Sequence, residues 1–177
     1  MAKDKLLLFK VLSIISFLVS VSVIYLLPYP KAPSVSLPAN QISDLSTFGF
    51  VEVTPEVAVA NGNALVSLTG GCYRVTANTD IPQAESIANG FEHKIPVRPN
   101  MHDLMKETFD NLGIKVLMVK VVDVKDNNYI GRLIIQQGDN VLSLDSKPSD
   151  GIAIAVRTNS TIYFKESLMK ERGKNIC

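Results

Sequence analysis

The side chains best suited to chemistry in this sequence are three carboxylates and one histidine in its C-terminal half. Asp103, Asp145 and Asp150 are candidate ligands of a divalent metal ion, Mg²⁺ or Mn²⁺, because hard cations prefer carboxylate oxygens. Such an ion polarises a phosphate and activates water, which is what hydrolysis of a phosphodiester bond needs. In that scheme His102 is the candidate base, and the predicted catalytic set is His102, Asp103 and Asp150.

Two cations and a hydroxyl lie close to those residues in the sequence and are candidates for binding substrate. Arg98 and Lys147 would hold the negative charge of a phosphate, and Ser149 would donate a hydrogen bond to it. The two cations also have a structural interpretation, as ion pairs with Asp103 or Asp150 that tie one helix start to another. The residues support both interpretations equally.

The aspartates themselves also suit a structural role. Asp103 and Asp150 fall in the first turns of predicted helices, where the helix dipole favours negative charge, and Ser149 is a natural N-cap. Successive helical residues lie about 100° apart, so His102 and Asp103 do not share a helix face. Both roles stay open at the level of sequence.

The segments that position these groups are predicted to include four helices. The clearest begins after Asn100, a good N-cap, and ends before Gly113, with an apolar stripe along one side. Another opens with Lys147-Pro148-Ser149-Asp150 and continues as GIAIAVR, which is apolar almost all round and therefore buried. The predicted helices run over residues 81–90, 101–112, 147–157 and 166–172.

Strands are predicted from short runs rich in β-branched residues, separated by turn formers such as Asn61-Gly62 and Gly70-Gly71. The first three runs predict a small antiparallel meander, and the next two predict a hairpin that turns into a further strand. The fold class is therefore α+β, with one compact domain of a mostly antiparallel mixed β-sheet and about four short helices. The predicted strands run over residues 48–53, 64–68, 72–76, 114–124, 129–136, 141–145 and 162–164.

The N-terminal region has the composition of a membrane anchor followed by a tether. Residues 11–27 carry no charge, and with residues 6–9 they reach about 20 residues, the length of a membrane-spanning helix. The alternative is a cleaved secretory signal, but the run is long and ends without a small-residue cleavage site. We expect a single-pass anchor over 1–27, a proline- and serine-rich tether over 28–46 and a folded domain over 47–177.

Charge and cysteine usage bear on location and on binding partners. Three lysines precede the span and one follows closely, which favours a cytoplasmic N-terminus and an extracytoplasmic C-terminal domain. Beyond residue 46, 14 basic and 15 acidic residues leave a charge of −1, without the basic excess typical of sequence-independent nucleic-acid binding. Cys72 and Cys177 are the two cysteines; a bridge between them is possible outside the cytoplasm, but two unrelated thiols are favoured.

Several short motifs, in order along residues 98–164, resemble the bifunctional nuclease family. The motifs are Arg98-Pro99, His102-Asp103-Leu104, Asp145, Pro148-Ser149-Asp150 and Ile162-Tyr163. The resemblance implies a compact α/β domain, often oligomeric, some of whose members cut both DNA and RNA, and it brings no established catalytic set. Lys147 and Gly151 stand where the family usually has arginine and alanine, and Gln83 stands where it has glutamate.

Two functions are compatible with these features. The first is a membrane-anchored nuclease that uses a divalent metal ion to hydrolyse phosphodiester bonds of DNA or RNA, and that assembles as a homo-oligomer. The alternative is a non-catalytic, membrane-tethered module for binding or assembly. Its charged cluster at two helix starts would recognise a partner or a small anion.

Overall fold

A computed structural model describes residues 10, 13–14, 16 and 44–177. Nearly all of the predicted anchor over residues 1–27 and most of the predicted tether over 28–46 lie outside the described residues. Among the residues that are described, no helix is both long enough and apolar enough to cross a membrane. The chain divides into two units, Met1–Ser36 and Leu37–Cys177, and the second contains the folded domain.

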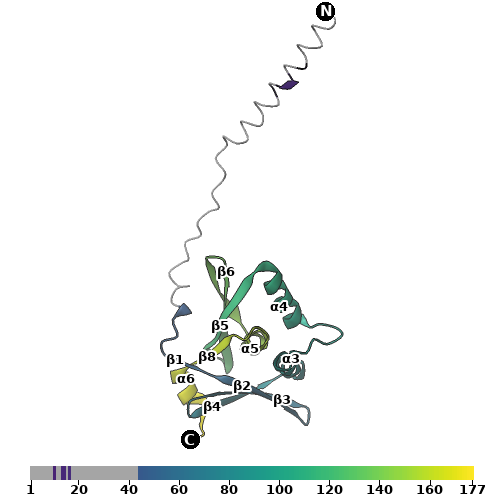
Figure 1. Cartoon of the computed structure of the whole chain (residues 1–177). Coiled ribbons are helices and arrows are strands. Elements are labelled where there is room, and N and C mark those ends of the chain that lie inside the picture. Colours follow the sequence, from purple (N-terminus) through teal and green to yellow (C-terminus); the bar gives the residue numbers. More distant parts are fainter. Residues whose placement is uncertain (1–9, 11–12, 15, 17–43) are drawn as a thin grey trace, which may run out of the picture. The chain divides into compact units, whose positions relative to one another are not determined.

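The domain consists of two sheets and four helices, which confirms the predicted α+β class and helix number (Figure 1). The helices are α3 (Ile81–Phe91), α4 (Met101–Leu112), α5 (Pro148–Thr158) and α6 (Glu166–Arg172). The strands are β1 (Phe50–Glu52), β2 (Thr54–Ala60), β3 (Asn63–Gly70), β4 (Tyr73–Thr79), β5 (Ile114–Lys125), β6 (Asn128–Gln137), β7 (Asn140–Ser146), β8 (Thr161–Lys165) and β9 (Lys174–Asn175).

The strands form two sheets and not the single sheet that the sequence predicted. The larger sheet has the order β1-β8-β5-β6-β7, and β8 is parallel to β5 while the other pairs are antiparallel. The smaller sheet has the order β2-β3-β4-β9 and is antiparallel throughout. β8 can lie parallel beside β5 because α5 carries the chain back across the larger sheet.

The first predicted strand does not belong to the meander. β1 pairs with β8 in the larger sheet, and the meander begins instead with β2, which the sequence did not predict. The chain passes from one sheet to the other at Val53, whose N–H donates to the carbonyl of Ile162. This exchange is possible because β8 has one edge against β5 and the other edge free to receive β1.

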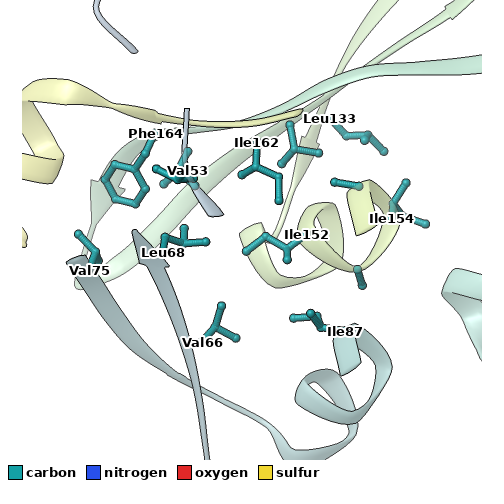
Figure 2. Packing of buried hydrophobic residues seen from close by; sticks show 14 of the residues in the cluster. Val53, Val66, Leu68, Val75, Ile87, Leu133, Ile152, Ile154, Ile162 and Phe164 are labelled. Carbon is teal, nitrogen blue, oxygen red and sulfur yellow. The ribbon is translucent and has the colours of Figure 1, made fainter. Parts of the chain in front are cut away.

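The hydrophobic core lies between the two sheets and around α5. In Figure 2, Val66, Leu68 and Val75 from the smaller sheet face Ile152 of α5 and Phe164 of β8. The residues of α5 between Gly151 and Ala155 are all buried, as its apolar sequence predicted. The start of this helix is therefore held firmly between the sheets.

Gly151 explains how closely α5 approaches the larger sheet. A Cβ atom at this position would lie 2.8 Å from Cγ1 of Val119 on β5, closer than side chains tolerate. The alanine that is usual in the resembling family would therefore need Val119 to move. Glycine at this position fits the packing of this particular chain.

The helix ends confirm some predictions and correct others. Asn100 caps α4 through a reciprocal capping box with Asp103, and Gly113 ends it in the left-handed region with φ 65°, as predicted. Ser149, predicted as a cap, is instead inside α5, and Lys147 is its N-cap. The reason is that Pro148 takes the first helical position, where its missing N–H costs nothing.

The preference for two unrelated thiols is wrong, because Cys72 and Cys177 form a disulfide. The short strand β9, which follows the predicted last strand, pairs with β4 through Tyr73–Asn175 and Arg74–Lys174. This pairing brings the C-terminal residues to the turn between β3 and β4, with the two cysteine Cα atoms 5.2 Å apart.

Candidate functional site

Three helix starts meet around Asp150 and bring polar side chains together. Asp80 and Gln83 come from the start of α3, His102 from the first turn of α4, and Lys147 and Asp150 from the start of α5. We call these five residues the helix-start cluster. The sequence predicted such a cluster at two helix starts, and the structure adds the start of α3.

Asp150 is the central member of the helix-start cluster. Its Oδ1 atom lies 3.4 Å from Nε2 of His102 and accepts a hydrogen bond from Nε2 of Gln83. The Asp150 side chain keeps 43% of its surface exposed, so it remains accessible to solvent. Lys147 does not pair with Asp103 or Asp150 but lies 3.4 Å from Asp80. Of the predicted catalytic residues, His102 and Asp150 are thus brought together.

Asp103 points away from this cluster into a buried network with Arg157. Its Oδ1 accepts from Nε of Arg157 at 2.8 Å, and its Oδ2 accepts from the backbone N–H of Asn100 at 2.9 Å. Asp103 is 8% exposed and Arg157 is 9% exposed. His102 and Asp103 therefore face different neighbours, as their adjacent helix positions predicted, and both oxygens of Asp103 are already engaged.

Arg157 is the central donor of the buried network, and it is not among the site residues predicted from the sequence. Beyond Asp103, its guanidinium donates to the backbone carbonyls of Ser86 and Ala153 and to Oγ of Ser86 at 3.2 Å. These bonds connect the last turn of α5 to α3 and α4. The available signal was the single charge at the end of the otherwise apolar run GIAIAVR, because a buried arginine requires a partner.

The hydrogen bonds around Ser86 determine which ring nitrogen of neutral His102 carries the proton. Oγ of Ser86 accepts from Nδ2 of Asn100 at 3.1 Å and from Nη2 of Arg157 at 3.2 Å, since both of those groups only donate. The hydroxyl proton of Ser86 is then donated to Nδ1 of His102, 2.9 Å away. Neutral His102 carries its own proton on Nε2 and directs it toward Asp150.

The pKa values of His102 and Asp103 are both shifted downward. Burial lowers the pKa of His102, the charge of Arg157 adds to this, and the nearby carboxylates of Asp150 and Asp103 oppose it. For Asp103, burial acts to raise the pKa, but the bonds from Asn100 and Arg157 outweigh it and hold the pKa below its usual range. The histidine is therefore favoured neutral and this carboxyl ionised.

The predicted metal ligands do not converge on one point. Asp145 pairs with Arg132 at 2.8 Å, and its side chain is 79% exposed, while Asp103 is committed to Arg157. Within residues 44–177 and the few described before them, no three His, Cys, Asp or Glu side chains are grouped so as to hold a metal ion. As placed, the three carboxylates do not fit a single divalent ion. Arg98 is exposed in the loop between α3 and α4.

A cleft of about 810 Å³ opens beside the helix-start cluster, between the two sheets. Its walls include β3 and β4 of the smaller sheet, the tip of the β5–β6 hairpin and the start of α5. Three residues predicted to act on substrate or metal line it: Asp145, Lys147 and Ser149. The predicted site is thus divided between the cleft and the neighbouring helix-start cluster.

Comparison with known proteins places these features in a family. Residues 75–176, more than half of the chain, match the bifunctional nuclease domain. An uncharacterized protein of Mycobacterium tuberculosis is 32% identical over 95 residues, which cover 52% of this chain and 56% of that protein. Bifunctional nuclease 1 of Arabidopsis thaliana is 32% identical over 82 residues, which cover 45% of this chain and 25% of that protein.

A bifunctional nuclease of Oryza minuta is 30% identical over 86 residues, which cover 47% of this chain and 26% of that protein. The chain therefore spans about half the length of the mycobacterial relative and about a quarter of the plant ones. The family match includes all three helix starts of the cluster, because α3, α4 and α5 lie within residues 75–176. This chain belongs to the bifunctional nuclease domain family, whose description points to a nuclease-like function.

Proposed function

We propose that this chain is a nuclease that hydrolyses phosphodiester bonds of DNA or RNA at the helix-start cluster. The observation that carries the proposal is the contact between His102 and Asp150, at the starts of α4 and α5, beside a cleft lined by Lys147 and Ser149. A carboxylate held by a neutral imidazole next to a cation is a suitable arrangement for activating water near a phosphate.

Asp150 is proposed to accept the proton of the attacking water. Gln83 and His102 hold its Oδ1 atom, and no described side chain is bonded to Oδ2, which is the oxygen proposed to face the attacking water. Water then attacks the phosphorus, the bond from phosphorus to the leaving oxygen breaks, and that oxygen takes a proton from solvent. His102 orients the carboxylate through its Nε2–H and is not itself free to act as the base that the sequence suggested, because its Nδ1 accepts from Ser86.

Lys147, Ser149 and Arg98 are proposed to bind the phosphate. Lys147 is exposed and is the N-cap of α5, at the end of the helix where the dipole favours an anion. Arg98, in the neighbouring loop, would contact a more distant phosphate. Asp103 is proposed as a positioning residue, since its bonds to Arg157 and Asn100 fix the first turn of α4 and with it His102.

The divalent ion stays a prediction, and no step of the proposed hydrolysis depends on it. The three predicted ligands do not fit one ion, so an ion would have to be held largely by Asp150 together with substrate oxygens. Cleavage measured with Mg²⁺, with Mn²⁺ and with a chelator shows whether the activity depends on a divalent ion.

The homo-oligomer also stays a prediction, and analytical ultracentrifugation of the purified chain can check it.

We also propose that residues 1–27 anchor the protein in a membrane, with a cytoplasmic N-terminus and an extracytoplasmic domain. The uncharged run over residues 11–27 and the lysines before it support this proposal. The disulfide between Cys72 and Cys177 also supports it, because such bonds persist mainly in oxidising compartments. A reporter active only outside the cytoplasm, fused after Cys177, is expected to give signal; signal from a cytoplasm-specific reporter would contradict the topology.

Cleavage by the purified full chain tests the nuclease proposal. Wild type is expected to cut DNA and RNA, and Asp150→Asn is expected to lower kcat by about 100-fold or more while the thermal unfolding temperature stays near that of wild type. Asp110→Asn, an exposed carboxylate of α4, is the matched control. Equal activity of wild type and Asp150→Asn would overturn the proposal. Binding of nucleic acid or another anion without cleavage would favour the non-catalytic module.

A further inference from the structure

We infer that the cleft between the two sheets binds one unpaired nucleotide of the substrate, with the base between the sheets and the phosphate at the start of α5. This inference rests on the proposed function, because it names the form of nucleic acid that the helix-start cluster acts on. The cleft was not foreseen from the sequence, and its two ends differ in chemistry.

The inner end of the cleft is apolar on both sides. Val66, Leu68 and Val75 come from the smaller sheet, and Ile152 and Phe164 come from α5 and the larger sheet (Figure 2). Apolar walls of this kind suit the faces of an aromatic base, which are apolar while its edges carry polar atoms. The volume of about 810 Å³ lies within the range of small-molecule sites, about 300 to 1,000 Å³.

The end near α5 carries hydroxyl groups that lack partners. Oγ of Ser149, Oγ of Ser146 and Oγ1 of Thr79 are buried and have no hydrogen-bond partner among the described residues, and all three residues line the cleft. Ser149 is 8% exposed, so its hydroxyl is shielded from bulk solvent. Buried hydroxyls without partners favour a ligand that offers hydrogen-bond acceptors, such as phosphate oxygens.

Charge at the same end also suits a phosphate. Ser149 is in the first turn of α5, a helix of 11 residues whose N-terminus carries positive dipole charge. The N–H groups of Asp150 and Gly151 in this turn already donate to the carbonyl of Lys147, so the dipole is what favours an anion here. Lys147 lines the cleft and is paired with Asp80 at the surface. Exposed pairs of this kind contribute little free energy, so Lys147 can turn to a bound phosphate at small cost.

A base that enters this cleft has to come from a nucleotide outside a duplex. A base inside a duplex is stacked on both faces and paired along its edge, so it must be unpaired and unstacked before it can enter a pocket. Tyr129 and Asn128, at the tip of the β5–β6 hairpin, also line the cleft, and the ring of Tyr129 lies 5.8 Å from that of Phe164. We therefore expect a preference for single strands and strand ends over duplex.

Fluorescence anisotropy of the purified full chain with labelled oligonucleotides tests this preference. A single strand of about ten nucleotides is expected to bind at least about tenfold more tightly than the same sequence in a blunt duplex, and a nucleoside monophosphate is expected to compete with it. Equal affinity for single strand and duplex, or no competition by the monophosphate, would overturn the inference.

Variants locate the binding to the cleft. Ala77 pairs with Val66 on the inner face of the smaller sheet and lines the cleft, so Ala77→Trp should fill it and weaken single-strand binding by about tenfold or more. Ala58→Trp is the matched control, because Ala58 pairs with exposed Leu65 and is itself exposed. Ser149→Ala, a small change that keeps the fold, should weaken phosphate binding by about tenfold. Wild-type affinity in both Ala77→Trp and Ser149→Ala would exclude the cleft as the site.

The failure of this inference can be told apart from failure of the proposed function. If single strands bind in the cleft but no cleavage occurs, the nuclease proposal fails and the nucleotide site stands. If cleavage is lost in Asp150→Asn but KM is unchanged in folded Ala77→Trp and Ser149→Ala, the nuclease proposal stands and the nucleotide site fails.

Discussion

Arg157 and Asp103 form a buried ion pair that joins the end of α5 to the start of α4. With both side chains 6% exposed, each charge depends on the other and on Asn100 and Ser86 for compensation. The usual role of such a pair is to hold elements in one arrangement, which here fixes the helix that carries His102. This structural role was one of the two that the sequence left open for Asp103.

Removing one partner of that pair is expected to destabilise the domain. Arg157→Met should lower the free energy of unfolding by about 3–5 kcal/mol, because it leaves Asp103 charged and buried without its partner. Urea denaturation followed by circular dichroism measures the change. The control is Lys106→Met, which removes the exposed i,i+4 pair with Asp110 and should cost no more than about 0.5 kcal/mol. Equal losses in the two variants would contradict the role assigned to Arg157.

His102 makes stability depend on pH. Because its pKa in the folded protein is below the ordinary 6.5, the unfolded chain binds a proton more readily, and stability falls as the pH drops below about 6.5. The loss grows until the pH reaches the lowered pKa of the folded state. The charges that face the ring are Asp150 and Arg157 from α5 and Asp103 from α4.

The midpoint of urea denaturation, measured at pH 7.5 and at about pH 5.5, checks this dependence. Wild type is expected to lose stability between the two values, and His102→Gln should lose clearly less because the titrating group is gone. Asp103 contributes in a separate, more acidic range: its lowered pKa adds stability above 3.8 that is lost as the pH falls through the folded value. An identical pH dependence in wild type and His102→Gln would show that other groups cause it.

At the scale of secondary-structure elements, the close packing of α3 against α5 depends on Gly90. The sequence predicted this glycine as the end of the helix, but α3 continues to Phe91 and Gly90 lies buried inside it. A Cβ atom there would lie 2.5 Å from Cγ2 of Val156 and 2.9 Å from Nη1 of Arg157. Close packing against the buried guanidinium, not termination, is therefore the reason for glycine at this position.

Gly90→Ala is expected to destabilise the domain even though alanine is the better helix former. Helix propensity alone would stabilise by up to about 1 kcal/mol, but displacing Arg157 and Val156 should cost about 1–3 kcal/mol. At exposed Glu85 of the same helix, the difference between Glu85→Gly and Glu85→Ala gives the glycine-to-alanine propensity effect without the clash. Thermal unfolding of the three variants separates propensity from the clash, and a stabilised Gly90→Ala would refute the close approach.

For the domain as a whole, the disulfide closes a loop that runs from the turn before β4 to the C-terminus and contains all four helices. It joins residues 105 positions apart and fixes β9 and the C-terminus against the β3–β4 turn. In the chain-entropy model, closing a loop of about 100 residues stabilises the folded state by about 4–5 kcal/mol. The bond therefore matters for stability well beyond the two short strands that it connects.

Reduction is expected to lower the unfolding temperature markedly. Cys72→Ser with Cys177→Ser should reproduce the effect, and adding reductant to the double variant should cause no further change. Calorimetry with and without reductant measures both. An unfolding temperature that is insensitive to reductant in wild type would show that the two sulfurs do not stabilise the fold through a bond.

The sequence by itself determined the elements whose signals are local. Asn100 and Gly113 delimit α4, the turn formers after Lys125 produce the β5–β6 hairpin, and the apolar run after Asp150 marks α5 as buried. Each signal depends on neighbours a few residues away, through a cap, a turn or a helical stripe, so it can be recognised without knowing the fold. The positions of His102, Lys147, Ser149 and Asp150 at helix starts were likewise predictable.

Tertiary structure alone decided which distant segments meet. It moved β1 into the larger sheet, paired Cys72 with Cys177 across 105 positions, and placed Arg157 against Asp103 across 54. It also buried Lys120, whose ammonium donates to the carbonyls of Asp44 and Ser46. Pairing over such separations depends on packing and on burial of charge in the complete fold, which no local pattern records. The cleft belongs to this class, because its walls come from two sheets and a helix that the sequence keeps apart.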